Sequence, residues 1–203
     1  MNKKRYMFVG VLGIVILSIL AIFMVEKCIN EKENDAKKFA IEYAEVEKDN
    51  VFIYSDINEI LNIMKNGTGV VYLGFPESKW CQKYVTILNE VAKENEIDKI
   101  YYYNIYNDIK NNTENYQKLI SILDEYLQFD AENKKKIDIP NISFHIEGKI
   151  IGNISEKNIE NDMENIQEYW TENKKAKLKN DLNIYMEEIF SYSNMCTQTQ
   201  CHE

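Results

Sequence analysis

The most reactive side chains in this 203-residue chain belong to its four cysteines and two histidines. They are Cys28, Cys81, His145, Cys196, Cys201 and His202. A thiolate attacks disulfides and binds metal ions, whereas a neutral thiol does neither readily. No two cysteines have the C-x-x-C spacing of a zinc site, and no glycine-rich phosphate loop is present. We therefore expect no bound metal ion and no cofactor, and thiol chemistry is the first candidate.

Cys81 is the cysteine best placed for reaction, because it follows Trp80 where a helix is predicted to begin. The positive end of a helix dipole stabilises a thiolate and lowers the pKa of the thiol, and Lys79 and Lys83 would act in the same direction. The pattern predicts an exposed, activated thiol at Cys81 that attacks a disulfide and forms a mixed disulfide. The alternative is a buried cysteine that serves as a small apolar side chain.

The other reactive side chains have simpler interpretations. Cys196 and Cys201, in the C-terminal sequence CTQTQC, form a small disulfide in the tail or remain two thiols. His145 lies in a predicted strand and is interpreted as a core or surface residue, and His202 as part of the tail.

The elements that must position Cys81 can be followed along the chain. Residues 70–75 form a nearly continuous apolar run, which is typical of a central strand covered on both faces. A loop over 76–81 follows, and then a helix with its apolar residues on one stripe. Residues 99–105 form a further strand.

The remaining elements complete one α/β unit. Residues 51–54 form a short β-rich run, and Asp56 with Glu59 resembles a capping box that opens a helix. The stretch 112–136 is predicted to be rich in helix. Ile142–Ile146 and Lys149–Gly152 flank Glu147 and Gly148, which indicates a β-hairpin, and helices follow from 155 to 192, with a second helix start at Thr171. Alternating strands and helices predict layers around one sheet.

The first 25 residues predict a membrane anchor. Lys3, Lys4 and Arg5 precede twenty uncharged, mostly apolar residues over 6–25, which is long enough to span a bilayer. The exit, Met-Val-Glu-Lys, lacks a small-residue cleavage site, so we expect an uncleaved signal anchor with its N-terminus in the cytoplasm; the alternative is a cleaved secretory signal. Residues 26–50 are predicted to be a charged stalk outside the cell membrane.

Composition limits the classes of partner. The chain is 45% hydrophobic and 28% charged, as in an ordinary globular protein. Its net charge is −9, and because residues 1–25 carry three cations and no acid, the rest carries −12. A body this acidic argues against nucleic-acid binding.

Three local features resemble the thioredoxin-like superfamily over about residues 51–165. They are the apolar strand that leads into Trp80-Cys81, the Ile139-Pro140 pair directly before a strand, and the sequence EGKIIG at 147–152. The resemblance is to membrane-anchored Gram-positive members, including bacteriocin-transport accessory proteins. It implies a three-layer α/β/α sandwich with a central mixed sheet, a cis-Pro140 facing Cys81, and a substrate-binding surface at Trp80, Ile139 and Pro140.

The chain departs from the family at the reactive site. The family motif is Cys-x-x-Cys, but this chain has Cys81-Gln82-Lys83-Tyr84, so Tyr84 replaces the resolving cysteine. Leu73 stands near the position of the buried acid that assists proton transfer in thioredoxins. The region 107–136 is also longer than in compact members.

Two functions therefore remain open, and whether the protein is an enzyme is undecided. The first is monothiol thiol–disulfide exchange on exported proteins through Cys81. The second is a redox-inactive binding or accessory module for a secretion, bacteriocin-transport or envelope partner. In both, the layout is an anchor over 1–25, a stalk over 26–50, the thioredoxin-like domain with a helical extension over 51–192, and a flexible tail over 193–203.

Overall fold

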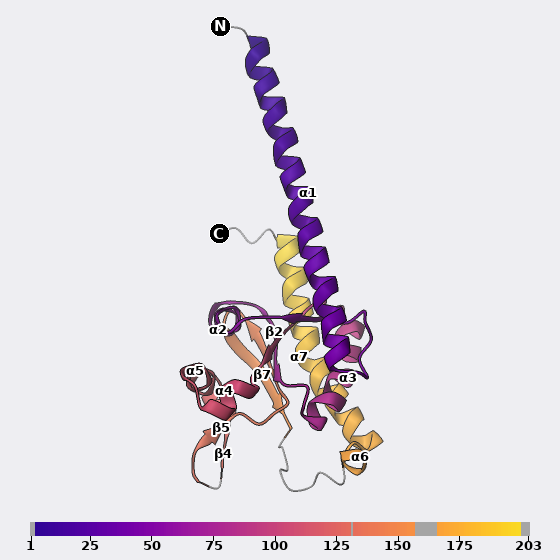
Figure 1. Cartoon of the computed structure of the whole chain (residues 1–203), viewed down its shortest axis with the longest axis vertical. Helices are drawn as coiled ribbons and strands as arrows, with labels where there is room; N and C mark the ends of the chain where they lie inside the picture. The colour runs from indigo at the N-terminus through magenta and orange to yellow at the C-terminus, as the bar shows by residue number, and fades with distance from the viewer. Residues whose placement is uncertain (1–2, 131, 157–165, 200–203) are drawn as a thin grey trace.

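The structure is a computed structural model that describes residues 3–130, 132–156 and 166–199. Side chains are described from residue 16 onward, except at 28, 167, 168 and 197–199. Figure 1 shows a long helix that projects from a body in which helices lie on both faces of a sheet.

The body is built on a five-stranded sheet with the order β1-β3-β2-β6-β7. Strands β1 (Phe52–Tyr54), β3 (Ile100–Asn104) and β2 (Gly69–Gly74) are parallel, and β6 (Asn141–Ile146) and β7 (Lys149–Ser155) are antiparallel. This confirms the central mixed sheet that the family resemblance implies. The predicted hairpin is also present, because Glu147 and Gly148 take φ values of +48° and +74° in the turn between β6 and β7.

One face of the sheet is covered by α2 (Ile57–Asn66), with α4 (Tyr106–Asn111) and α5 (Glu114–Leu123) beside it. Asp56 caps α2 as expected, since its carboxylate accepts the N–H groups of Asn58 at 2.7 Å and Glu59 at 3.0 Å. The predicted helical stretch 112–136 is only partly helical. After α5 come the 3-10 turn η1 (Asp124–Tyr126) and a short hairpin of β4 (Gln128–Phe129) and β5 (Lys135–Lys136).

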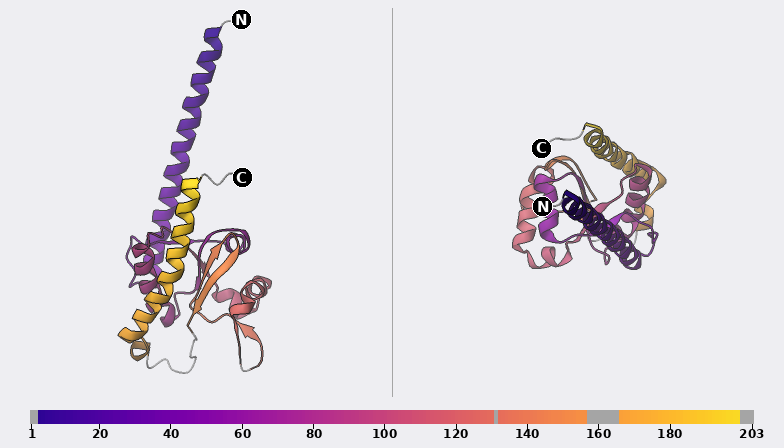
Figure 2. Two further views of the ribbon diagram at one scale, coloured as in Figure 1. Left: turned by 180° about the vertical axis from the view of Figure 1, so that it is seen from behind. Right: turned by 90° about the horizontal axis from the view of Figure 1, so that it is seen from above.

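The other face is covered by α3 (Lys79–Glu94), α7 (Glu172–Thr199) and the end of α1 (Lys3–Glu42), as Figure 2 shows from two further sides. The short helix α6 (Ile166–Tyr169) precedes α7, whose start is confirmed by the hydrogen bond from Lys174 N–H to the Thr171 hydroxyl at 3.3 Å. Because α7 continues through Thr199, residues 193–199 are helical, whereas the sequence predicted a flexible tail.

The stalk predicted over 26–50 is helical through Glu42, and its last turns enter the core. Phe39 is fully buried, with its ring stacked on Tyr43 at 4.3 Å and on Phe52 at 3.9 Å. The Asp35 carboxylate accepts the N–H of Tyr54 at 2.9 Å, so α1 also closes the edge of β1.

The described part of α1 exposes a run of large apolar side chains where it leaves the body. They are Ile16, Leu17, Ile19, Leu20, Ile22, Phe23, Met24 and Val25. Among the residues that the structure describes, no helix is both long and apolar enough to cross a bilayer.

Candidate functional site

Cys81 lies in the first turn of α3, as the sequence predicted. Ser78 caps this helix, and its hydroxyl accepts the N–H of Cys81 at 3.3 Å. The strand β2 ends at Gly74, so residues 75–78 form the turn that brings the thiol to the carboxyl end of the sheet.

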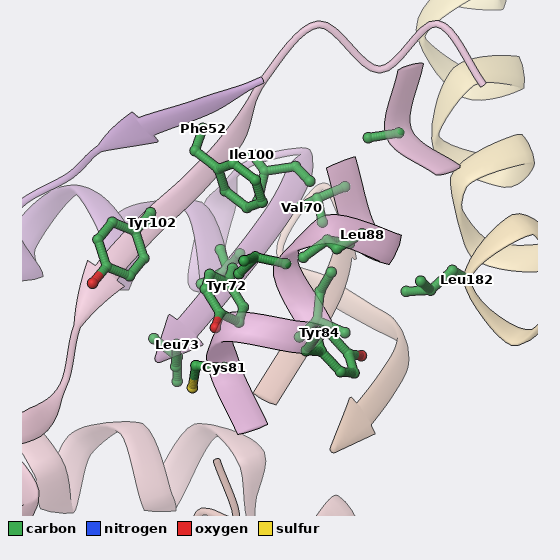
Figure 3. Packing of buried hydrophobic residues seen from close by; sticks show 14 of the residues in the cluster. Phe52, Val70, Tyr72, Leu73, Cys81, Tyr84, Leu88, Ile100, Tyr102 and Leu182 are labelled. Carbon is green, nitrogen blue, oxygen red and sulfur yellow. The ribbon is translucent and has the colours of Figure 1, made fainter. Parts of the chain in front are cut away.

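The prediction of an exposed thiol is wrong, because the exposed fraction of Cys81 is 0%. Figure 3 shows its sulfur among buried side chains, near Leu73 and Tyr72. Burial raises the pKa of the Cys81 thiol, and the neighbouring polar groups of Tyr72, the Phe75 backbone and Ser78, which favour the thiolate, do not compensate for it. The expected lowering of the pKa by the helix end is therefore overcome by desolvation.

Of the two lysines expected to activate the thiol, one is paired with a carboxylate and the other is exposed to solvent. Lys83 forms an ion pair with Glu45, and Lys79 is exposed. A charge that is paired and solvated does little to stabilise a thiolate inside the core.

No nearby phenol replaces the missing base. The hydroxyl of Tyr43 donates to that of Tyr102 at 3.3 Å, and burial raises the pKa of Tyr43 and of Tyr72 well above the ordinary value. These hydroxyls stay protonated at neutral pH and cannot take the proton of Cys81. Leu73, at the position of the family's buried acid, is fully buried and apolar.

Tyr84 stands at the position where the Cys-x-x-Cys motif has its resolving cysteine. Its ring is fully buried, lies parallel to Tyr72 at 6.4 Å and meets Trp170 edge-on at 6.3 Å. The position that releases a mixed disulfide in a dithiol site is thus part of the packing of α3 against β2 and against Trp170, which lies between α6 and α7.

Trp80 does not form the substrate surface predicted for it, since only 6% of the residue is exposed. Its ring meets Tyr169 edge-on at 4.4 Å and lies 6.3 Å from Trp170. The C-terminal extension covers this side chain, and the sequence offered no sign of that contact.

The Ile139–Pro140 peptide bond is cis, which confirms the expectation from the resemblance. Leu73 pairs with Asn141 in the β2–β6 register, so Pro140 lies beside Gly74, just before the turn that leads to Cys81. The carbonyl of Pro140 accepts the N–H of Glu156 at 3.1 Å. Within the part of the chain that the structure describes, neither the N–H nor the C=O of Ile139 has a hydrogen-bond partner.

A pocket of about 270 Å³ lies next to Ile139. We call it the cis-proline pocket. Its apolar lining consists of Phe75, Tyr106, Ile109, Tyr116, Ile137 and Ile139. These residues come from the turn after β2, from α4, from α5 and from the loop before β6. Sequence reasoning missed all of them except Ile139; the only signal was the long region 107–136, which supplies Ile109 and Tyr116.

A larger cavity of about 620 Å³ lies between α3 and α7. The lysines on its rim are paired within the protein: Lys83 with Glu45, Lys179 with Glu90, and Lys175 with Glu172. Because these charges are compensated, the cavity presents no ionic group for chemistry.

Of the two cysteines in the C-terminal tail, Cys196 lies among the described residues and Cys201 does not. Cys196 is half-buried on α7, and Tyr192 lies close to it. Cys201 and the side chain of Cys28 lie outside the described residues, so the Cys196–Cys201 disulfide stays a prediction. Among the residues that the structure describes, no group of three potential metal ligands occurs.

No family model matches the chain, and no curated protein is significantly similar to it. Among solved structures, thioredoxin O2 from Arabidopsis thaliana in its oxidized state is similar, with a TM-score of 0.36 and 14% identity over 53% of this chain and 84% of that chain. Such a score adds no argument of its own. The structure itself shows a mixed α/β fold, and its strand order, terminal antiparallel hairpin and cis-proline agree with the features that the resemblance implied.

Proposed function

We propose that this protein is a redox-inactive, thioredoxin-like binding module, anchored in the cell membrane, that holds extended segments of exported or envelope proteins beside Ile139–Pro140. The observation that carries the proposal is the contrast between two neighbouring sites. The backbone of Ile139 is unpaired beside an open apolar pocket, whereas Cys81 is sealed in the core.

The groove suits an extended chain. A buried residue with an unpaired N–H and C=O gains free energy when a partner backbone pairs with both groups. Main-chain pairing supplies affinity regardless of sequence, while a side-chain pocket next to it supplies specificity. The cis-proline pocket stands in that relation to Ile139.

Thiol–disulfide exchange is disfavoured on three grounds. The reaction needs a thiolate, access for the client disulfide and a second thiol to release the product. Burial raises the pKa of Cys81 and removes access, and Tyr84 occupies the place of the second thiol.

The membrane part of the proposal is supported by the sequence of residues 1–25 and by the end of α1 that leaves the body. The large apolar side chains exposed from Ile16 to Val25 are unfavourable in water and suited to hydrocarbon. The three cations at the N-terminus favour a cytoplasmic N-terminus and an extracytoplasmic body. The choice of a secretion or bacteriocin-transport apparatus in a Gram-positive bacterium as the partner rests on the family resemblance alone.

Alkylation of Cys81 tests the redox half of the proposal. In full-length protein whose other three cysteines are replaced by serine, we expect iodoacetamide to react slowly with the folded chain and quickly with the denatured chain. The rate should rise with a midpoint above the ordinary thiol pKa of about 8.5. A fast reaction with a midpoint below that value would restore monothiol exchange.

Peptide binding tests the other half. Tyr106→Ala should weaken the binding of extended apolar peptides to the full-length protein, and Cys81→Ala should leave it unchanged. Equal effects of the two substitutions would contradict binding at the cis-proline pocket.

A further inference from the structure

We propose that the cis-proline pocket selects an extended partner segment in which a large apolar, preferably aromatic, side chain is followed by an acidic one. This inference rests on the proposed function and names the chemistry that the groove recognises. Four features of the pocket support it: its size, its aromatic wall, the hydrogen bonds that hold its opposite wall in place, and the charge at its rim.

The size of the pocket indicates a single side chain. Small-molecule sites usually enclose about 300–1,000 Å³, and this pocket encloses about 270 Å³. Its lining is mainly aromatic and aliphatic, so a large apolar side chain of a bound peptide matches it better than a cofactor does.

Two rings form a wall against which a third ring can pack. Phe75 and Tyr106 meet edge-to-face with their centroids 5.2 Å apart, and 40% of Tyr106 remains exposed. Aromatic groups prefer such edge-to-face and offset contacts, which add to the free energy of apolar burial.

The opposite wall is held in place by a buried tyrosine. The Tyr116 hydroxyl accepts the N–H of Ile137 at 3.3 Å, and the Thr113 hydroxyl caps α5 by accepting the N–H of Tyr116 at 3.2 Å. The loop before the cis peptide bond is therefore fixed to α5 before any partner binds, which lowers the entropy cost of binding.

Among the described residues that line the pocket, one cation is uncompensated. Lys136 and Asp138 lie 4.0 Å apart and offset each other. Lys110 is exposed on α4, one turn after Tyr106, and its ammonium lies 5.8 Å from the centre of the Tyr106 ring. No carboxylate of the described residues pairs with Lys110, although the chain as a whole is strongly acidic.

Lys110 therefore gives the groove a local charge opposite to that of the body. A carboxylate next to the inserted apolar side chain would meet this ammonium, and a cationic residue there would be repelled. A nucleic acid does not fit this surface, because a single cation in a body of net −12 cannot bind a phosphate backbone.

The test is binding of labelled Gly/Ser-based peptides to the full-length protein in detergent micelles, read by fluorescence anisotropy. The peptides carry Phe-Asp, Phe-Asn, Phe-Lys or Ala-Asp at the centre. We expect Phe-Asp to bind about three- to fivefold more tightly than Phe-Lys, and Ala-Asp to bind about tenfold more weakly than Phe-Asp. Lys110→Glu should reverse the preference between Asp and Lys.

Lys118→Glu is the matched control, because it makes the same charge change at an exposed position of α5 outside the pocket. Lys118→Glu should leave the preference for Phe-Asp over Phe-Lys as it is in the unchanged protein. Both variants should unfold at the same temperature as the unchanged protein. Equal binding of Phe-Asp and Phe-Lys, or equal effects of the two substitutions, would overturn the selectivity while peptide binding stands. If no peptide binds, the proposed function fails and the selectivity fails with it.

Discussion

Cys81 is subject to two opposing effects on its protonation. The start of α3 and the neighbouring polar groups of Tyr72 and Ser78 favour the thiolate, while complete burial favours the neutral thiol. Helix-end effects are worth about 0.3–1 kcal/mol at ordinary sites, whereas desolvation of a buried charge costs several kcal/mol. The direction of the shift in the pKa follows from this difference, and it makes Cys81 a packing residue.

Burial also shifts the pKa of His145, in the direction that favours the neutral side chain. It is fully buried on β6, its Nε2 lies 2.8 Å from the Ser143 hydroxyl, and burial lowers its pKa to about 4 although the backbone of Met64 acts in the other direction. The folded chain therefore holds a neutral imidazole at pH values where the unfolded chain already binds a proton.

We predict that His145 destabilises the fold as the pH falls. The pKa of His145 in the folded chain lies below the unfolded value of about 6.5. Protonation of His145 therefore does not lower the free energy of unfolding above that pH, and lowers it progressively as the pH falls to about 4. At pH 5 the loss is about 2 kcal/mol. Urea unfolding at pH 7 and pH 5 measures it, with His145→Gln as the control that cannot titrate. The same drop in both proteins would contradict the prediction.

At the scale of elements, the end of α1 behaves as part of the domain. Its buried side chains form an aromatic cluster with β1 and β3, and the Gln82 side chain of α3 donates to the backbone carbonyl of Glu42 at 2.8 Å. The helix that leaves the body is therefore continuous with the core, so the proposed anchor and the domain would share one element.

A pair of substitutions on α1 tests this integration. Phe39→Ala removes a fully buried ring and should lower the free energy of unfolding by about 3–5 kcal/mol. Ile41→Ala, two residues on and 81% exposed, should change it by no more than about 0.5 kcal/mol. Urea unfolding of both variants decides the matter, and similar small losses would mean that α1 is a detachable stalk.

At the scale of the whole molecule, the acidic residues and the apolar run lie in two separate parts of the chain. The acidic residues all lie after residue 25, and the apolar run lies before it. On the proposed arrangement, α1 carries the groove away from the membrane surface, and the acidic body is kept off anionic lipids by repulsion.

We predict that the full chain stays with bacterial membranes after an alkaline wash, and that a chain lacking residues 1–25 appears in the soluble fraction. The shortened chain keeps Ala36, the first buried side chain of the described part of α1, so its core is intact. Protease added to intact cells should digest the body. Release of the full chain by the wash would disprove the anchor, and a mature mass lacking the apolar run would support the cleaved secretory signal.

Much of the fold could be predicted from sequence because its signals are local. The apolar run of β2, the Asp56 cap of α2 and the Glu147–Gly148 turn each involve a few neighbouring residues whose conformational preferences agree with the final structure. The cis form of Pro140 followed from the resemblance and not from local preference, since about 5–6% of X–Pro bonds are cis in general.

The exposure of Cys81 and Trp80 and the existence of the cis-proline pocket were decided only by tertiary structure. Burial depends on side chains far along the chain. Tyr169 of α6 and Trp170 after it cover Trp80, and the pocket joins Phe75 to the loop before Pro140 through α4 and α5. The sequence by itself determined the strand and the helix on either side of Cys81 and where the thiol lies on its helix. Whether that thiol meets water depends on which distant elements pack over it, and the resulting desolvation outweighs the local effect of the helix end.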